Sequence, residues 1–490
     1  MVQTKGITLE ELKRAFQKTG DVKFQHFVFQ QETVHIITCE AMINEQLLYE
    51  RVLPELEKHL NGNAANGMKE KEAEQGQLKN LEFSLVLPQL QKVDDLANCE
   101  RLLFTGQCLM YFMNHHELLV TNIAKKPNRQ PEDTSLEVAV KGPRDNFIED
   151  IATNIALVRK RLPTSTLAVD KMQIGVRSKT EVAILYFDDI VDKKILSEIK
   201  GQLEKIEVDI VFSGEILFET ISKKVSFFPK NEYTGRPDFA IQALVRGRFV
   251  IFIDGTAYAL LLPTNFFLLL KTGEDNEYPV IYTSFQRILR LSGIIFGLLL
   301  PAFWLALTTF HQNQIPLQLL ATVVQANMGL PLPSVLEMLL MIFFFELFRE
   351  AGLRLPSVVG GTISVVGGLI IGDAAIRAGI TSPAMVVVIA ISTISGFTLV
   401  NQALLASVTI LRIAFVIITS FFGLFGFFAC IYFTLVYLSQ IRTFGVPYIN
   451  IASDLDTKAI LKSLIRLEGP KYEKRPKMLK PNDKTRRGRK

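Results

Sequence analysis

The feature that most constrains this chain is a succession of long apolar runs between residues 288 and 438. Residues 291–310, 378–411 and 414–438 contain no charged residue, and residues 334–348 form a further apolar run that includes glutamates. A stretch of about 18 or more apolar residues matches the hydrocarbon core of a bilayer. One soluble core does not need several such runs in succession, so the sequence predicts a polytopic membrane protein.

Basic residues that flank these runs predict how the membrane domain is oriented. Arg287 and Arg290 precede the first run, and a basic tail that begins at Arg442 follows the last one. Basic flanks favour the cytoplasmic side, so we expect both ends of the domain inside and an even number of crossings. We expect the loops around Gln312 and Asn401 to face outward.

Four transmembrane helices satisfy this requirement, and we expect them near residues 291–310, 334–348, 383–400 and 409–438. The Gly-rich residues 356–372 are then predicted to form a re-entrant or interfacial segment, because their glycines suit close packing or a broken helix. Arg412 is the one basic residue that this topology does not explain.

The region before the membrane domain is predicted to be cytoplasmic and to contain two similar α/β subdomains. Strand and helix patterns recur in order: the segment that begins at Glu32 matches the one at Thr180, and the segment at Thr105 matches the one at Arg246. In the second copy, Asp254 followed by glycine predicts a hairpin turn. We therefore expect an α/β region of two subdomains followed by an all-α membrane domain. The predicted boundaries are 1–140 and 141–286 for the subdomains, 287–441 for the transmembrane domain and 442–490 for a basic cytoplasmic tail.

Cysteine usage and the N-terminus limit the compartment. The four cysteines are scattered without a CxxC pair, which fits a reducing compartment and offers no metal framework. The first residues contain no apolar segment or cleavage site of a secretory signal, so we expect the α/β region in the cytoplasm. His115 and His116 lack the spacing and companion ligands of a metal site, and we interpret them as a surface turn.

No motif in the sequence predicts an enzyme. A Walker loop, GxGxxG, a nucleophile elbow and HExxH are all missing. We therefore expect a non-enzymatic protein without a cofactor or a metal. The Lys/Arg-rich tail is interpreted as a signal for topology and lipid headgroups, and not as a nucleic-acid-binding arm.

Short motifs follow one another in a fixed order over most of the chain, between Lys141 and Tyr448. They include Gly142-Pro143-Arg144, Phe228-Pro229, Arg236-Pro237-Asp238, Glu346 to Gly352, Val366 to Gly372 and Phe444 to Tyr448. In this order the motifs resemble the A subunits of the GerA-type nutrient germinant receptors of endospore-forming bacteria.

The resemblance implies a multi-pass subunit in the inner membrane of the dormant spore, with both termini cytoplasmic. It also implies two partners, a permease-like B subunit that holds the nutrient and a lipoprotein C subunit. In such a complex the A subunit would oligomerise into an ion-conducting pore. The main prediction is therefore a homo-oligomeric channel that triggers germination. The alternative is a scaffold or signalling subunit, whose cytoplasmic domain binds a ligand or partner and whose membrane part only anchors it.

Charged residues inside the membrane domain are candidates for a pore or gate. Glu337 is an acid in a membrane helix, which suggests function. However, Ser334 and Glu337 also have the spacing of a capping box, and we favour that local role. Glu346, Arg349 and Glu350 share one helix face near the inner end. A gating or subunit-contact role and a plain solvated position both remain open for them.

The glycines of residues 356–372 are the second group of candidates. Close helix packing would explain them simply. Because five of them fall in one run between polar ends, we prefer a pore or gate element. The candidates named on this ground are Gly367, Gly368 and Gly372.

Overall fold

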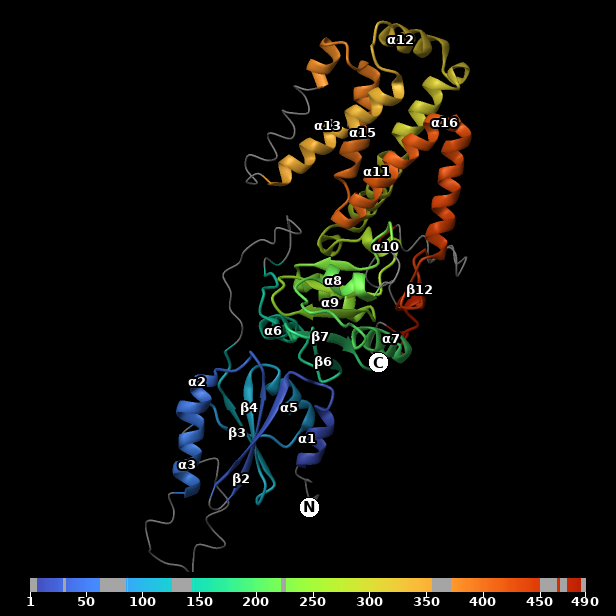
Figure 1. Ribbon diagram of the computed structural model, residues 1–490. Coiled ribbons are helices and arrows are strands. Elements are labelled where there is room, and N and C mark those ends of the chain that lie inside the picture. Colours follow the sequence, from blue (N-terminus) through green and yellow to red (C-terminus); the bar gives the residue numbers. More distant parts are fainter. Residues whose placement is uncertain are drawn as a thin grey trace, which may run out of the picture. The chain divides into compact units, whose positions relative to one another are not determined.

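Contacts within the computed structural model divide the chain into two compact units (Figure 1). The first, the α/β unit, comprises Met1–Val225, Tyr233–Pro263 and Glu473–Lys490. The second, the helical unit, comprises Ser226–Glu232 and Thr264–Tyr472. The structure describes residues 7–29, 32–61, 85, 87–125, 143, 145–221, 226–354, 372–449, 465–467 and 474–485.

The first half of the α/β unit is a five-stranded antiparallel sheet with helices on both faces. Its elements are α1 (Leu9–Ala15), β1 (Val22–Val28), β2 (Thr33–Cys39), α2 (Glu45–Leu47), the π-helix η1 (Leu48–Val52), α3 (Leu53–Asn61), β3 (Gln91–Lys92), α5 (Leu96–Leu103), β4 (Gln107–Phe112) and β5 (Glu117–Asn122). Ile37 and Leu109 pack in a cluster with residues of α1 and α5, whereas Ile36 and Met110 pack in a cluster with residues of α3. The period of two in a strand thus buries both faces of the sheet.

The second half of the α/β unit is built around another five-stranded sheet. Its elements are α6 (Ile151–Arg161), β6 (Leu167–Ile174), β7 (Thr180–Phe187), α7 (Lys193–Leu203), α8 (Gly214–Ile221), β8 (Glu232–Thr234), α9 (Pro237–Val245), β9 (Phe249–Ile253) and β10 (Ala259–Leu262). Helices α6 and α9 pack on one face, where Ile155 and Ala243 join the cluster that contains Leu185 and Val250. The Asp254 carboxylate accepts a hydrogen bond from the backbone N–H of Ile151 at 3.3 Å, so the predicted hairpin turn also holds the start of α6.

The two sheets have the same topology. Their strand orders, β1-β2-β4-β5-β3 and β6-β7-β9-β10-β8, differ only by a constant step of five in numbering. The segments that begin at Glu32 and Thr180 form the second strands of their sheets, β2 and β7. Those at Thr105 and Arg246 lead into the third positions, β4 and β9. The prediction of two similar α/β subdomains is therefore confirmed.

A buried ion pair joins the two subdomains. The Arg159 guanidinium donates from Nε to Asp21 Oδ2 at 2.7 Å and from Nη2 to Asp21 Oδ1 at 2.8 Å. It also donates to the carbonyl oxygens of Thr164 and Leu167, and it stacks 4.3 Å from the centre of the Phe104 ring. Because Arg159 is fully buried and bonded on several sides, the junction is a fixed contact.

Part of the C-terminal tail belongs to the α/β unit. Within residues 474–485, Asn482 donates to the carbonyl oxygens of Ile190 and Val191, both at 2.8 Å. Arg475 Nε donates to the carbonyl oxygen of Val245 at 3.0 Å, and Leu479 in the 3-10 helix η8 (Lys477–Leu479) is buried. The predicted basic tail is thus a packed segment over these residues.

Among the residues of the helical unit that the structure describes, two helices are long and apolar enough to cross a membrane, α11 and α16. In chain order its elements are α10 (Phe266–Leu269), the 3-10 helix η4 (Gly273–Asn276), α11 (Val280–Thr309), the 3-10 helix η5 (Gln312–Gln314), α12 (Leu317–Asn327), α13 (Ser334–Arg354), α15 (Pro383–Gly396), α16 (Gln402–Gln440), β11 (Arg442–Thr443) and β12 (Val446–Pro447). The other two predicted crossings fall on α13 and α15 and stay predictions. The predicted re-entrant segment, residues 356–372, lies outside the described residues except for its last glycine.

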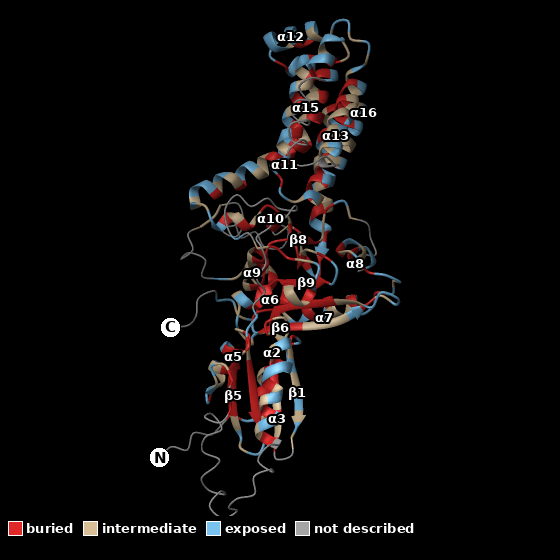
Figure 2. Cartoon of the chain, turned by 90° about the vertical axis from the view of Figure 1, so that its left-hand side faces the viewer, coloured by how far each residue is buried: buried red, intermediate tan, exposed pale blue. Residues whose placement is uncertain are grey.

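The helical unit exposes many large apolar side chains. Phe296 is 49% exposed on α11, Ile394 is 63% exposed on α15, and Phe421 and Phe425 are 74% and 76% exposed on α16. Figure 2 also shows α12 mostly in the colour of exposed residues. An apolar surface on several helices suits contact with lipid, where backbone groups are satisfied within helices and apolar side chains face outward.

Helix α16 is not the single straight helix predicted over residues 409–438. At Gly423 the backbone takes a φ of 58°, outside helical geometry, and a positive φ is open to glycine at little cost. A Cβ at Gly426 would lie 3.0 Å from the carbonyl oxygen of Ile418, so the chain folds back sharply. Figure 1 accordingly shows α16 as two arms that meet at a turn.

This break corrects the predicted placement of two loops. A Cβ at Gly423 would lie 3.2 Å from the His311 ring, so the turn in α16 lies beside Gln312 at the end of α11. The Asn401 loop lies toward the other end of the apolar part of α11. Gly293, close to where that part begins, packs against the end of α15: a Cβ added at Gly293 would lie 2.7 Å from the Ser395 carbonyl oxygen. Gln312 and Asn401 therefore cannot face the same side of a membrane that α11 crosses.

Candidate functional site

One polar network ties four helices of the helical unit together; we call it the central network. Arg412 of α16 is only 3% exposed, and its Nη2 contacts Glu346 Oε1 of α13 in an ion pair. Its Nη1 donates to Ser392 Oγ of α15 at 3.2 Å, and Ser392 Oγ in turn donates to the carbonyl oxygen of Gly297 in α11 at 2.8 Å. Each of the four helices contributes at least one member.

Glu346 is shared between two guanidinium groups. Arg349, one turn along α13, places Nη2 2.6 Å from Glu346 Oε2, while Arg412 holds Oε1. Thr409 also donates to Oε1 at 3.4 Å. The Nε atoms of Arg349 and Arg412 are buried and have no hydrogen-bond partner among the described residues. The network is therefore held together but not fully satisfied, unlike most buried polar groups.

Glu337 caps a helix, but not its own. Its Oε1 accepts hydrogen bonds from Thr381 Oγ1 at 2.8 Å, from the Ser382 backbone N–H at 2.7 Å and from Ser382 Oγ at 3.0 Å. Ser382 is the N-cap of α15, so the buried carboxylate sits where unpaired N–H groups and the helix dipole favour negative charge. The predicted capping box with Ser334 is therefore wrong, because the Glu337 carboxylate caps the neighbouring helix α15 and not its own helix.

These contacts also fix the relative direction of two helices. Glu337 near the start of α13 meets Ser382 at the start of α15, and Glu346 further along meets the Arg412 side chain that also holds Ser392. Helices α13 and α15 therefore run in the same direction. The network holds two parallel neighbours against α16.

The glycine candidates are only partly placed. Gly367 and Gly368 lie outside the described residues. Gly372 is the first described residue of a helical stretch that includes residues 372–377, and a Cβ there would lie 3.3 Å from Val386 Cγ1 in the first turn of α15. Gly372 is therefore a close-packing position near the Glu337 cap and is not a member of the central network.

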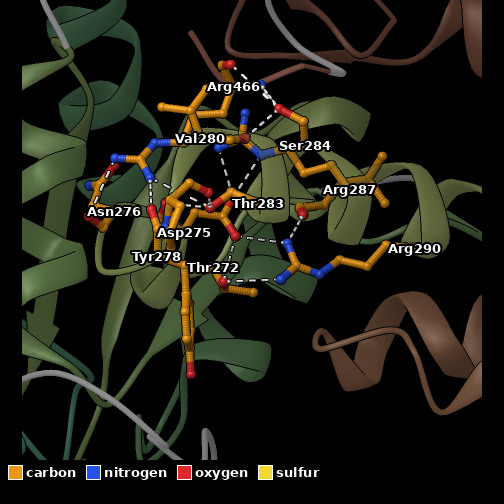
Figure 3. Close-up of polar contacts among 12 residues, drawn as sticks. Thr272, Asp275, Asn276, Tyr278, Val280, Thr283, Ser284, Arg287, Arg290 and Arg466 are labelled. Atoms are coloured by element: carbon orange, nitrogen blue, oxygen red, sulfur yellow. Dashed lines mark hydrogen bonds and ion pairs between the residues drawn. The ribbon is translucent and has the colours of Figure 1, made fainter. Parts of the chain in front are cut away.

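A second group of charges, the juxtamembrane cluster, surrounds Asp275 just before α11 (Figure 3). Arg287 donates to Asp275 Oδ2 from Nε at 2.8 Å and from Nη2 at 2.7 Å. Arg290 donates to Oδ1 at 2.9 Å and to the Leu270 carbonyl oxygen at 2.9 Å, and Thr272 Oγ1 donates to Oδ1 at 2.9 Å. The first turns of α11 are thereby fixed to the loop before it.

The electrostatics of this cluster keep Asp275 ionised. Burial by itself raises the pKa of the Asp275 carboxyl, but the charges of Arg287 and Arg290 act against it, with hydrogen bonds from Arg290 and Thr272. The net result is a pKa below the usual value. Two basic residues that we used only to predict topology thus make specific buried contacts.

Sequence reasoning singled out Glu337, Glu346 and Arg349 but missed their partners. Ser392 is a small polar residue in an apolar run, and nothing local shows that it meets Arg412. Arg412 itself carried a signal, because a lone charge within an apolar helix of a membrane protein normally has a partner. Asp275 carried none, since an acid in a loop before a helix is ordinary.

The central network connects helices through hydrogen bonds and ion pairs. Among the described residues, no group of three or more His, Cys, Asp or Glu side chains could hold a metal ion. What the central network offers is a tie between helices that one carboxylate and two competing arginines maintain. Such a tie can be strengthened or broken by small helix movements.

Two α/β subdomains followed by an apolar helical unit with buried charged ties define an integral membrane protein. The family model described as Bacillus/Clostridium GerA spore germination protein matches residues 10–478, and the chain belongs to this family. The resemblance seen in the order of motifs is therefore confirmed.

Known relatives match along nearly the whole chain. "Spore germination protein XA" of Bacillus anthracis is 39% identical over 457 residues, which cover 93% of this chain and 91% of the relative. "Spore germination protein KA" of Bacillus subtilis (strain 168) is 32% identical, with 98% of this chain and 87% of the relative covered. Among solved structures, the N-terminal domain of the A subunit of the Bacillus megaterium spore germinant receptor GerK3 is 25% identical, covers 52% of this chain and 94% of that chain, and has a TM-score of 0.37.

Proposed function

We propose that the chain is the non-enzymatic A subunit of a nutrient germinant receptor and that copies of it assemble into an ion-conducting pore in the inner membrane of the dormant spore. The observation that carries the proposal is the central network, in which a buried Arg412 is paired with a partly buried Glu346 inside an apolar helical unit. Placing charges there is costly, and such residues by default mark a functional site.

The network gives a physical basis for gating. Glu346 has two arginine partners, Arg349 on its own helix and Arg412 on α16. If α13 moves away from α16, the carboxylate keeps Arg349 and is not left unpaired. The cost of this movement then falls on Arg412, which keeps only the Ser392 hydroxyl as a partner. We propose Glu337, Glu346, Arg349, Gly367, Gly368 and Gly372 as pore or gating residues, and we add Arg412.

We propose that the α/β unit and the C-terminal segment lie in the cytoplasm. Residues 474–485 pack on the α/β unit, so both must be on the same side of the membrane, which requires an even number of crossings. The basic residues Arg287 and Arg290 before the apolar part of α11 favour the inner side. The loop at Gln312 would then face outward and the loop at Asn401 inward.

The partners follow from the same proposal. A germinant receptor A subunit would work with a permease-like B subunit that holds the nutrient and with a lipoprotein C subunit. Membrane lipids would contact the exposed apolar faces of α11, α15 and α16.

The test is conduction by the assembled receptor. The three subunits reconstituted in liposomes should release small cations when the nutrient is added, and chemical cross-linking should trap oligomers of this chain. An otherwise responsive receptor in which this chain stays monomeric and passes no ions would overturn the pore proposal.

The repeated sheets support a second candidate, a scaffold whose α/β unit binds a ligand or partner and whose helices only anchor it. Two similar subdomains often enclose a binding site. However, the buried Arg159–Asp21 pair fixes their junction. Substitutions distinguish the pore from the scaffold. A response to nutrient that survives the neutral substitution Glu346→Gln but is lost after surface substitutions on the α/β unit would favour the scaffold.

A further inference from the structure

The C-terminal segment returns to the start of α11 and places one arginine there (Figure 3). Arg466 Nη1 contacts the carbonyl oxygen of Tyr278, and Nη2 donates to the carbonyl oxygen of Asn276 at 3.3 Å. Nη1 also lies 3.5 Å from Thr283 Oγ1, and the Arg466 backbone N–H donates to Ser284 Oγ at 3.1 Å. We call these four acceptors the Arg466 socket.

The Arg466 socket is continuous with the juxtamembrane cluster. Thr283 Oγ1 donates to the carbonyl oxygen of Asp275 at 3.1 Å, and the Asp275 carboxylate is held by Arg287 and Arg290. The loop between Asp275 and α11 is therefore fixed from two sides. Arginines of α11 hold its carboxylate, and the C-terminal segment holds its carbonyl oxygens.

We propose that Arg466 is a positioning residue through which the C-terminal segment sets the start of α11 and so tunes the response of the receptor. The idea rests on the proposed function, because α11 carries Gly297 of the central network. The chain that follows Arg466 packs on the α/β unit from residue 474 onward. Only a short stretch of chain thus separates the contacts of Arg466 from those that residues 474–485 make on the α/β unit.

The acceptors of the Arg466 socket allow Arg466 to dissociate from it more easily than an ion pair would. Carbonyl and hydroxyl oxygens hold a guanidinium less strongly than a carboxylate does. In addition, the positive end of the α11 dipole lies at its first turn, where a cation is disfavoured. Arg466 is thus held by good geometry against an opposing field, whereas Arg287 and Arg290 are held by a buried carboxylate. A pull on the C-terminal segment would free Arg466 first.

The experiment compares Arg466→Gln with Arg442→Gln in the full chain assembled with its partners. Arg442 is an exposed arginine of the same segment, so its variant removes the same charge without touching the socket. Ser284→Ala serves as a second variant that weakens the socket from the α11 side. Hydrogen exchange of residues 276–290 and the nutrient concentration for half-maximal germination of spores are measured for each.

We expect Arg466→Gln and Ser284→Ala to speed exchange over residues 276–290, and Arg442→Gln to leave it unchanged. The half-maximal nutrient concentration should shift by about tenfold for Arg466→Gln, the factor that corresponds to about 1.4 kcal/mol, or one charge-assisted hydrogen bond. Unchanged exchange would overturn the docking of Arg466. Faster exchange with an unshifted response would overturn its positioning role. Failure of the wild-type receptor to conduct ions would count against the pore alone, because exchange and germination do not depend on that measurement.

Discussion

The two units each contain a buried arginine that is paired with a carboxylate, and the two pairs are built differently. In the α/β unit, Arg159 binds Asp21 through two nitrogens and also binds two carbonyl oxygens, so its donors are nearly all used. In the helical unit, Arg412 makes one bond to a carboxylate that Arg349 also holds, and its Nε has no partner among the described residues. The first pair therefore has one favourable arrangement, whereas in the second pair the Glu346 carboxylate can also stay paired with Arg349 alone. We infer that the first is a fixed joint and the second a switch.

The largest stability effect is expected at the fixed joint. Arg159→Met would leave the Asp21 carboxylate buried without its partner, which typically costs about 3–5 kcal/mol. The matched control is Lys18→Met, which removes a partly exposed ion pair with Asp188 and should cost within about 1 kcal/mol. Thermal unfolding of the full chain in detergent measures both. Similar losses for the two variants would contradict the assignment of a fixed joint.

A smaller stability effect is expected at the switch. Arg412→Met leaves Glu346 paired with Arg349, so the loss should be about 1–3 kcal/mol, the usual range for a buried group that loses one bond. The visible change should be functional, because the tie between α13 and α16 is gone: receptors should release ions without nutrient. If Arg412→Met instead unfolds the protein as strongly as Arg159→Met, the two pairs are equivalent and the comparison fails.

Two substitutions of Glu337 distinguish the contribution of its hydrogen bonds to stability from the contribution of its charge. In Glu337→Gln the side-chain oxygen can still accept the bonds from Thr381 and Ser382, so a loss of about 0.5–1 kcal/mol is expected from the missing charge at the α15 dipole. Glu337→Leu also removes the cap and should cost about 1–2 kcal/mol. Thermal unfolding of the two variants checks the order. A larger loss for Gln than for Leu would show that the contact is not a cap.

The juxtamembrane cluster should depend on pH in one direction. The pKa of Asp275 is lowered in the folded protein, so its contribution to stability is present above the ordinary carboxyl range. That contribution is lost as the pH falls through the lowered pKa, below the ordinary range of an aspartate. The protection of the amides at the start of α11, measured as their exchange rate relative to an unfolded peptide at the same pH, should therefore be retained down to the ordinary carboxyl range and be lost only below it. A loss of protection already near neutral pH would rule out Asp275 as its origin.

The fold of the α/β unit could be predicted from the sequence because its signals are local. The period-two patterns around Thr180 and Arg246, and the Asp-Gly turn at Asp254, each depend on neighbouring residues. The repeat appeared because the same local patterns returned in the same order. Strand order within the sheets could not be predicted, since it depends on contacts far apart in the chain.

The helical unit was harder to predict because its decisive features are not local. Gly423 in an apolar run looks like any glycine of a packed membrane helix. Only its φ of 58° shows that it reverses the chain. Likewise, Glu337 has the sequence spacing of a capping box with Ser334, but its carboxylate contacts Ser382 on another helix. The charge of Arg412 in an apolar run indicated that it has a partner. It did not indicate which residue that is, because Glu346 lies 66 positions away in the chain.

The most direct test of the account is an exchange of charges in the central network. Glu346→Arg alone and Arg412→Glu alone each place like charges together, and we expect either variant to open without nutrient or to lose its response. The combined variant restores an opposite pair between α13 and α16, so nutrient-dependent ion release should return. If the combined variant is as defective as the single variants, or if the single variants respond normally, then Glu346 and Arg412 do not form the switch.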